Sequence, residues 1–180
     1  MPVRDYFGVF GLEPKLSLDP ADLQTRFYSL SREWHPDKFA RSSSAEQERA
    51  LEMTSLLNDG LRTLKDPVRR AEYILSQHGF EVAEQRGKDV PPELLEEVFE
   101  LNLALEELSS GDESAKAQIQ DALANFCAMR TEMDAEIGQI FHEYDRAPSK
   151  EVLGRLRAVL NRRRYIDNLV NEANKATEQG

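Results

Sequence analysis

The sequence predicts an all-α protein: an antiparallel helical hairpin with flanking short helices, followed by a three-helix bundle. Three observations support this fold class. Apolar residues recur at spacings of three and four, no segment shows the sustained alternation of a strand, and Asp-Pro pairs stand where helices would begin. We expect an N-terminal domain over residues 1–76, a linker over 77–91 and a C-terminal bundle over 92–180.

The first long helix of the N-terminal domain is predicted to begin at Asp19-Pro20, because Asp is a favoured N-cap and Pro fits the first helical position. It ends before Pro36, since the proline ring removes a backbone donor and restricts the preceding residue. Its buried face has spacings of four, three and four: Leu23, Phe27, Leu30 and Trp34. This pattern is typical of one face of an amphipathic helix.

A second amphipathic helix is predicted over residues 50–64, where apolar residues again follow helical spacing. The connection between the two helices is short, which makes them antiparallel. Asp66-Pro67 then begins a third helical segment that ends near Gly79. The N-terminal domain is therefore a helical hairpin with a shorter helix on either side.

The C-terminal bundle is predicted from three further helical stretches, over residues 93–108, 119–144 and 152–170. Each carries an apolar stripe at helical spacing, and polar breaks near Gly111 and Pro148 separate them. Three amphipathic helices with short connections favour an antiparallel bundle.

The chain is acidic, with 33 Asp and Glu against 23 Lys and Arg and a formal net charge of −10. The charge is concentrated in residues 81–147, which hold 17 acidic and 5 basic side chains. Such a segment repels phosphate backbones, so we expect no nucleic-acid partner. The short basic run Arg162-Arg163-Arg164 is interpreted as a solvated helix face.

Several classes of protein do not fit the sequence. No run approaches the roughly 18 apolar residues of a membrane span, and the first residues resemble neither a signal nor a transit peptide. We therefore expect no membrane partner and a cytoplasmic location. The three histidines lack metal-ligand spacing, and the single cysteine, Cys127, is expected to be a buried packing residue. No cofactor, metal or catalytic residue is predicted, and a hydrolase with paired carboxylates is kept only as an alternative.

One loop stands out, the connection His35-Pro36-Asp37-Lys38 between the two hairpin helices. A helix stop with a local cap would explain Pro36 but gives no need for His35. A stiff tip that holds a ring donor and a carboxylate outward is instead suited to docking on a partner at little ordering cost. The loop is therefore a candidate binding element.

With this loop in place, the first 75 residues resemble the J-domain family of co-chaperones. The matching segments are Asp5-Tyr6-Phe7, the helix that ends at Trp34, His35-Pro36-Asp37-Lys38-Phe39, the helix with Asn58, and Asp66-Pro67 followed by Arg70-Ala71-Glu72-Tyr73. The resemblance implies binding to a DnaK-type chaperone and stimulation of its ATP hydrolysis. The chaperone-binding residues that it implies are His35, Pro36, Asp37, Lys38, Arg26, Arg32 and Arg41. The basic face usual in the family is reduced here, which suggests a specialised partner.

The whole chain is similar to one subfamily, the HscB-type co-chaperones of iron–sulfur cluster assembly. This resemblance is carried by four segments and by the acidic helical domain that follows them. The segments are Asp5-Tyr6-Phe7 with Phe10-Gly11-Leu12, His35 to Phe39, Arg70-Ala71-Glu72-Tyr73, and Leu75-Ser76 with His78-Gly79-Phe80. It implies that the bundle holds an IscU-type iron–sulfur scaffold protein and presents it to an HscA-like chaperone. Some subfamily members carry a zinc module with paired cysteines, which this sequence lacks, so a bacterial cytoplasmic member is expected.

A second apolar line on the helix over residues 93–108 supports a client surface independently of the resemblance. Leu95, Phe99 and Leu103 follow one another at spacings of four beside glutamates, apart from the core stripe. A second line either packs on a second neighbouring helix or stays exposed. The resemblance implies these client-binding residues: Leu95, Phe99, Glu100, Leu103, Glu107 and Tyr165. At Leu103 the sequence departs from the subfamily, in which a carboxylate is common at this position. The alternative function is that of a general J-domain adaptor whose bundle serves another client or self-associates.

Overall fold

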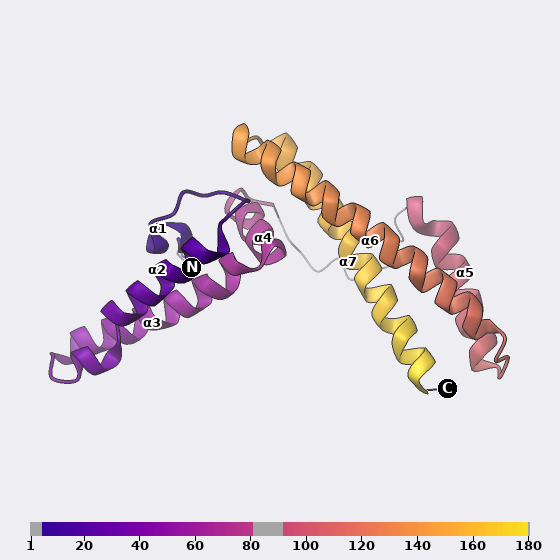
Figure 1. Cartoon of the computed structure of the whole chain (residues 1–180), viewed down its shortest axis with the longest axis horizontal. Helices are drawn as coiled ribbons and strands as arrows, with labels where there is room; N and C mark the ends of the chain where they lie inside the picture. The colour runs from indigo at the N-terminus through magenta and orange to yellow at the C-terminus, as the bar shows by residue number, and fades with distance from the viewer. Residues whose placement is uncertain (1–4, 81–91, 180) are drawn as a thin grey trace. The chain divides into compact units, whose positions relative to one another are not determined.

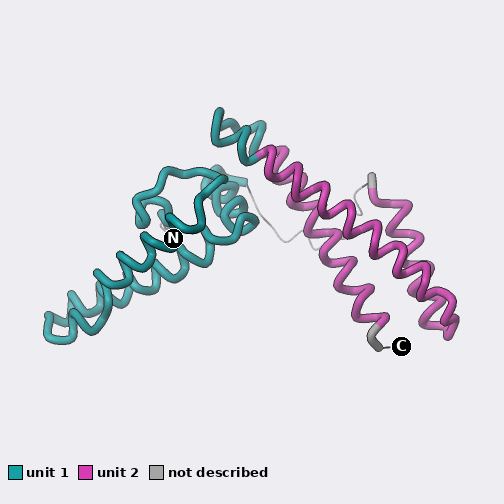
Figure 2. Tube along the Cα trace, in the orientation of Figure 1, with its two compact units in different colours: residues 1–82, 141–153 teal, residues 83–140, 154–180 magenta. Residues whose placement is uncertain are grey.

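The computed structural model of the chain describes residues 5–80 and 92–179. Within these residues the chain forms helices and no strand, so the predicted all-α fold is confirmed. Packing divides the chain into two compact units, shown in Figure 2: residues 1–82 with 141–153, and residues 83–140 with 154–180. No helix in the described ranges is long and apolar enough to cross a membrane.

Unit 1 contains the hairpin, with the element labels of Figure 1. Its elements are α1 (Tyr6–Phe10), α2 (Pro20–Glu33), the 3-10 helix η1 (Pro36–Phe39), α3 (Ser44–Lys65) and α4 (Pro67–Gln77). The Asp19 side chain accepts a hydrogen bond from the Ala21 amide, and Asp66 caps α4 in the same way through the Arg69 amide. Both predicted Asp-Pro helix starts are therefore confirmed.

Aromatic residues of α1 pack against a glycine of α3. A Cβ atom added at Gly60 would lie 2.8 Å from Phe10 Cε2 and 3.1 Å from Tyr6 Cδ1, so only glycine allows this approach. The Tyr6 amide donates to the Tyr73 hydroxyl at 3.1 Å, which links α1 to α4. Burial raises the pKa of that hydroxyl. These contacts fix α1 across the base of the hairpin.

Arg70 is a buried charged residue at the centre of unit 1, only 6% exposed. Its guanidinium donates to the backbone carbonyls of Leu16 and Leu64, so the loop before α2 and the end of α3 share one donor group. Burial lowers the pKa of Arg70, and the nearby charges of Asp145 and Asp66 oppose that effect. The Arg70 side chain thus holds the loop before α2 by binding the backbone carbonyl of Leu16.

Residues 141–153 complete unit 1, although they lie far along the sequence. They hold the end of α6 (Ala115–Arg146) and the start of α7 (Lys150–Gln179). The Asp145 carboxylate accepts hydrogen bonds from the Leu16 and Ser17 amides at 2.7 and 2.8 Å. The Tyr144 and His78 rings meet edge-on, with centroids 6.3 Å apart. The two hydrogen bonds to Asp145 satisfy two amides of the loop before α2.

Unit 2 has a core to which α5 (Leu95–Ser109), α6 and α7 all contribute. Its buried members are Leu94, Val98, Leu101, Ala104, Ile119, Phe126, Ile166, Leu169, Val170 and Ala173. Parts of the apolar stripes predicted for the three helices thus meet in one cluster, as in a helical bundle. The end of the second stripe and the start of the third, at Tyr144 and Val152, belong to unit 1 instead. The turn after α5 uses Gly111 at φ 93°, a left-handed angle that favours glycine.

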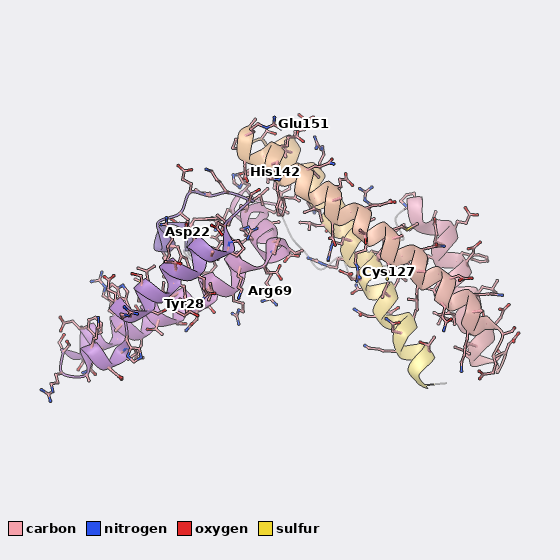
Figure 3. All side chains as sticks on the ribbon, in the orientation of Figure 1. Asp22, Tyr28, Arg69, Cys127, His142 and Glu151 are labelled. Carbon is pink, nitrogen blue, oxygen red and sulfur yellow. The ribbon has the colours of Figure 1, made fainter. Side chains whose placement is uncertain are left out.

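One expectation about this unit was wrong: Cys127 is exposed rather than buried (Figure 3). It follows Phe126, which is fully buried, and each helical residue turns by about 100°. Cys127 therefore points away from the core that its neighbour enters.

The predicted division into a domain over 1–76, a linker over 77–91 and a bundle over 92–180 stays a prediction. Most of the predicted linker, residues 81–91, lies outside the described residues. The compact units group residues 141–153 with the hairpin, because Asp145 and its neighbours pack there.

Candidate functional site

The first candidate site is the tip of the hairpin in unit 1, where His35, Pro36 and Asp37 form the entry to η1. Pro36 stands at the first position of the 3-10 helix, and His35 before it is extended at φ −62° and ψ 127°. His35 Nδ1 accepts from the Asp37 amide at 3.3 Å and lies 3.5 Å from an Asp37 carboxylate oxygen. The side chains of His35 and Asp37 are 57% and 91% exposed.

This arrangement leaves hydrogen-bonding capacity for a partner. Because Nδ1 accepts, the neutral His35 ring carries its proton on Nε2, which is then a donor. The Asp37 carboxylate is a negatively charged acceptor. Because it is already exposed, a partner can bind it without displacing other parts of this protein. The tip therefore presents a donor and a carboxylate on a proline-stiffened turn, as expected from the sequence.

Two stacked aromatic side chains, one at each end of the loop, support the tip. The rings of Trp34 and Phe39, on either side of the loop, are stacked with centroids 5.9 Å apart and planes at 11°. The Arg49 guanidinium of α3 lies 5.8 Å from the Trp34 ring centroid, a cation–π distance. Thr54 Oγ of α3 donates to the Trp34 carbonyl at 3.2 Å. These contacts hold both ends of the loop on α3.

The four predicted basic residues divide into two groups. Arg32, Lys38 and Arg41 are exposed and lie within a few residues of the tip. Arg26 instead donates to the Phe10 and Gly11 carbonyls at the end of α1 and pairs with Asp22 at 2.9 Å (Figure 3 labels Asp22). It satisfies carbonyls that the end of α1 leaves open. The structure thus brings three of the four basic residues to the tip.

The second candidate site is the exposed face of α5 in unit 2. Leu95, Phe99 and Leu103 are 55%, 69% and 47% exposed, whereas Val98 and Leu101 of the core stripe of the same helix are buried. Of the two alternatives for this second line, exposure is therefore the one observed. Of these three residues Phe99 exposes an aromatic ring, and burial of such a ring in an interface is a strong source of affinity. We name these three residues the α5 stripe.

Carboxylates surround the α5 stripe. Glu96 and Glu100 are exposed and Glu107 is half-buried on the same helix. Glutamates in the first turn of α5, such as Glu96, also interact favourably with the positive end of the helix dipole. The face therefore combines apolar anchors with a negative rim.

Tyr165 of α7 has a different environment from the α5 stripe. It is half-buried and packs against the core of unit 2 rather than standing free. Burial, with a smaller contribution from the charge of Glu172, raises the pKa of its hydroxyl, so Tyr165 stays neutral and can donate a hydrogen bond.

A shallow groove beside the α5 stripe was missed by the sequence interpretation. Its volume is about 360 Å³, and its lining comes from α5 and α6: Glu100, Leu103, Gln118, Asp121, Ala122 and Asn125. Counted from Gln118, the other three α6 residues lie three, four and seven positions later, which places all four on one helix face. That spacing is visible in the sequence, but which face of α6 lies beside α5 is not.

Comparisons with known proteins identify the family. A family model described as the HSCB C-terminal oligomerisation domain matches residues 90–174. The chaperone HscB from Vibrio cholerae is 30% identical, with a TM-score of 0.65, over 97% of this chain and 98% of that one. The crystal structure of the human co-chaperone protein HscB has 25% identity and a TM-score of 0.71, over 98% of this chain and 84% of that one.

The chain belongs to the HscB family. Its fold is the N-terminal J domain and C-terminal helical domain of that family, as predicted. Its role is that of a co-chaperone in iron–sulfur cluster assembly, and the family implies a chaperone and a scaffold protein as partners in general. Members of the family are generally not enzymes themselves.

Proposed function

We propose that this HscB-family chain delivers an IscU-type iron–sulfur scaffold protein to an HscA-like chaperone of the DnaK type and stimulates the ATP hydrolysis of that chaperone. It acts as a regulator without catalytic chemistry of its own, in the cytoplasm of a bacterium. The observation that carries the proposal is the exposure of the α5 stripe in a chain whose other unit exposes the His35-Pro36-Asp37 tip.

The tip is proposed to dock on the chaperone. A short stiff turn loses little conformational entropy on binding, so its few polar contacts contribute most of their free energy to the complex. The exposed Arg32, Lys38 and Arg41 surround these contacts with positive charge, which favours an acidic chaperone surface. Arg26 supports the position of α2 through its bonds to α1 and contributes to docking indirectly.

The chaperone part is tested by the steady-state ATPase rate of a purified HscA-like chaperone. Wild-type chain is expected to raise the rate severalfold. His35→Gln is expected to abolish the increase, because the flexible glutamine amide lacks the ring that accepts from the Asp37 amide and so holds its N–H donor in place at the tip. His142→Gln is the matched control, since His142 is an exposed histidine of α6 (Figure 3). Equal stimulation by wild type and His35→Gln would contradict the proposal.

The α5 stripe is proposed to bind the scaffold, with Leu95, Phe99 and Leu103 as apolar anchors. Glu100 and Glu107 supply the charged rim, and Tyr165 on α7 supplies a neutral hydroxyl donor. A few apolar anchors inside a polar rim is the usual distribution of affinity in small interfaces. The loss of an exposed aromatic anchor is therefore expected to dominate the effect of mutation.

The scaffold part is tested by calorimetric titration of purified scaffold into the chain. The double variant Phe99→Ala, Tyr165→Ala is expected to weaken binding by tenfold or more, about the effect of losing a hot-spot side chain. Leu51→Ala removes another exposed apolar side chain, 59% exposed on α3, and should leave the affinity unchanged. Undiminished binding by the double variant would favour a general adaptor with another client.

Self-association of the bundle is a second candidate, because the matching family model is described as an oligomerisation domain. In a two-fold contact through the α5 stripe, the glutamate rim would meet its own copy, and like charges would oppose the contact. Sedimentation of the chain alone distinguishes the two: a dimer that Phe99→Ala dissociates would favour self-association over scaffold binding.

A further inference from the structure

The groove between α5 and α6 continues the α5 stripe onto a second helix. Leu103 belongs to both, because it ends the stripe and also lines the groove. The volume of about 360 Å³ is at the lower end of the range in which proteins hold small ligands, so it suits a single long side chain better than a whole helix. Whatever covers the α5 stripe therefore lies beside this groove.

The chemistry of the lining selects a cation. Two of its lining residues are apolar, Leu103 and Ala122, and each helix contributes one carboxylate, Glu100 from α5 and Asp121 from α6. Within the described residues neither carboxylate has a cationic partner within ion-pair distance. Two uncompensated carboxylates that line one groove together with apolar side chains favour an incoming positive charge.

The shape of the groove fits an amphipathic side chain. Lysine and arginine carry a long apolar stem with the charge at its end, so the stem can cover Leu103 and Ala122 while the charged head reaches the carboxylates. The side-chain amides of Gln118 and Asn125 add oxygen acceptors on the α6 wall. An acidic or purely apolar side chain would leave Glu100 and Asp121 unpaired in a desolvated interface, at a cost.

We propose that the α5–α6 groove holds a lysine or arginine side chain of the scaffold protein that binds the α5 stripe, with Asp121 as the specificity-determining residue on α6. The inference rests on the proposed function, since it takes the same partner. It extends the interface from one helix to two. A second copy of this chain is disfavoured as occupant, because the charged residues of the groove, Glu100 and Asp121, are both acidic and would meet their own copies in a two-fold contact.

The test uses the full chain, uniformly labelled with nitrogen-15, and purified scaffold protein. Titration is expected to shift the side-chain amide signals of Gln118 and Asn125 together with the backbone signals of the α5 stripe. Asp121→Asn should weaken binding about two- to fivefold, in the range of one rim ion pair, and should reduce its salt dependence. Asp121→Lys should weaken it further.

The matched control is Glu132→Lys. Glu132 is exposed on the same helix and lies 11 residues from Asp121, about 16 Å along the helix and nearly on the same face. An equal loss of binding in Asp121→Lys and Glu132→Lys would overturn the inference, since the effect would then be one of net charge. The exposed, unpaired position of both residues makes misfolding an inadequate explanation of a difference.

Failure of this inference is distinguishable from failure of the proposed function. If scaffold shifts the stripe signals but not the Gln118 and Asn125 amides, the groove is empty in the complex and the inference is wrong, while the function stands. If scaffold shifts neither set, both are wrong. If the amide shifts depend on the concentration of the chain alone, the occupant is a second copy and the inference is wrong.

Discussion

Single side chains connect segments that are far apart in the sequence of unit 1. Asp145 is the clearest case, because its carboxylate binds the Leu16 and Ser17 amides about 129 residues away. Arg70 binds the Leu16 carbonyl, so both the donor and the acceptor of that peptide segment are held by charged side chains. The conformation of the loop before α2 therefore depends on two residues outside it.

Asp145→Asn is predicted to destabilise unit 1. Asparagine offers one oxygen in place of two and directs an NH₂ group toward an amide that also donates, so one part-buried amide donor loses its partner. The expected fall in the free energy of unfolding is about 1–3 kcal/mol. The single tryptophan, Trp34, lies in unit 1, so urea unfolding followed by its fluorescence measures the change.

Glu132→Gln provides the control for Asp145→Asn, because Glu132 is an exposed acidic residue of the same helix. Its effect should stay within about 0.5 kcal/mol, as is usual for surface substitutions. Unchanged urea midpoints for both variants would contradict the structural role of Asp145.

The residues of the two candidate sites differ in how far the sequence could predict them. Periodicity places Phe99 off the core stripe, because helical spacing assigns Val98 to the core and its neighbour to another face. Whether that face packs on a second helix or stays exposed was settled only by the structure, in which Phe99 is 69% exposed. The groove residue Asp121 could not be predicted, since it depends on which face of α6 lies beside α5. The engagement of Arg26 with α1 was likewise invisible, because its acceptors are backbone carbonyls that carry no sequence signature.

At the scale of elements, the ends of the helices were more predictable than their contacts. The Asp-Pro starts of α2 and α4 are set by local hydrogen bonds, which the sequence displays directly. α3 begins with a capping box, in which Ser43 and Glu46 each bind the other's backbone amide. The Ser43 hydroxyl and the Ser43 amide both donate to the Glu46 carboxylate, and these two hydrogen bonds, the hydroxyl first, lower the pKa of that carboxyl. Contacts between helices depend on rotation and depth, which local patterns do not specify.

The packing of α1 on α3 gives a prediction at this scale: Gly60→Ala should destabilise the protein. Alanine is the better helix former by about 1 kcal/mol, but its methyl group would overlap the buried Phe10 ring. Overpacking of that kind costs about 1–3 kcal/mol, so the net change should be a lower melting temperature by circular dichroism.

Gly138→Ala is the matched control for Gly60→Ala. Gly138 lies within α6, and no atom stands within 4 Å of an added Cβ. Here only helix propensity acts, and alanine should raise the stability of its helix by about 0.5–1 kcal/mol. A rise in melting temperature for both variants would show that α1 yields easily and would contradict the close packing at Gly60.

At the scale of the whole molecule, charge is distributed unevenly along the chain. Residues 81–147 hold 17 of the 33 acidic side chains but only 5 of the 23 basic ones. This asymmetry is visible in the sequence, and because of it we expect no nucleic-acid partner. The structure adds that the acidic rim lies beside exposed apolar residues, which turns a general property into a candidate binding face.

Scaffold binding is therefore predicted to depend on salt. Raising sodium chloride from about 50 to 300 mM should slow association several-fold, because screening shortens the reach of the acidic face, and should change dissociation less. Stopped-flow mixing of chain and scaffold measures both rates. Phe99→Ala should lower the affinity and keep the same salt dependence of association, and a rate independent of salt would contradict an acidic docking face.

The participation of residues 141–153 in unit 1 has a consequence for synthesis on the ribosome. The hairpin emerges first, but the Asp145 carboxylate that binds the Leu16 and Ser17 amides follows about 60 residues later. At about 5–20 residues per second, this interval lasts roughly 3–12 s. During that time the loop before α2 lacks its final partner, so the first unit completes its fold only after most of the second has been made.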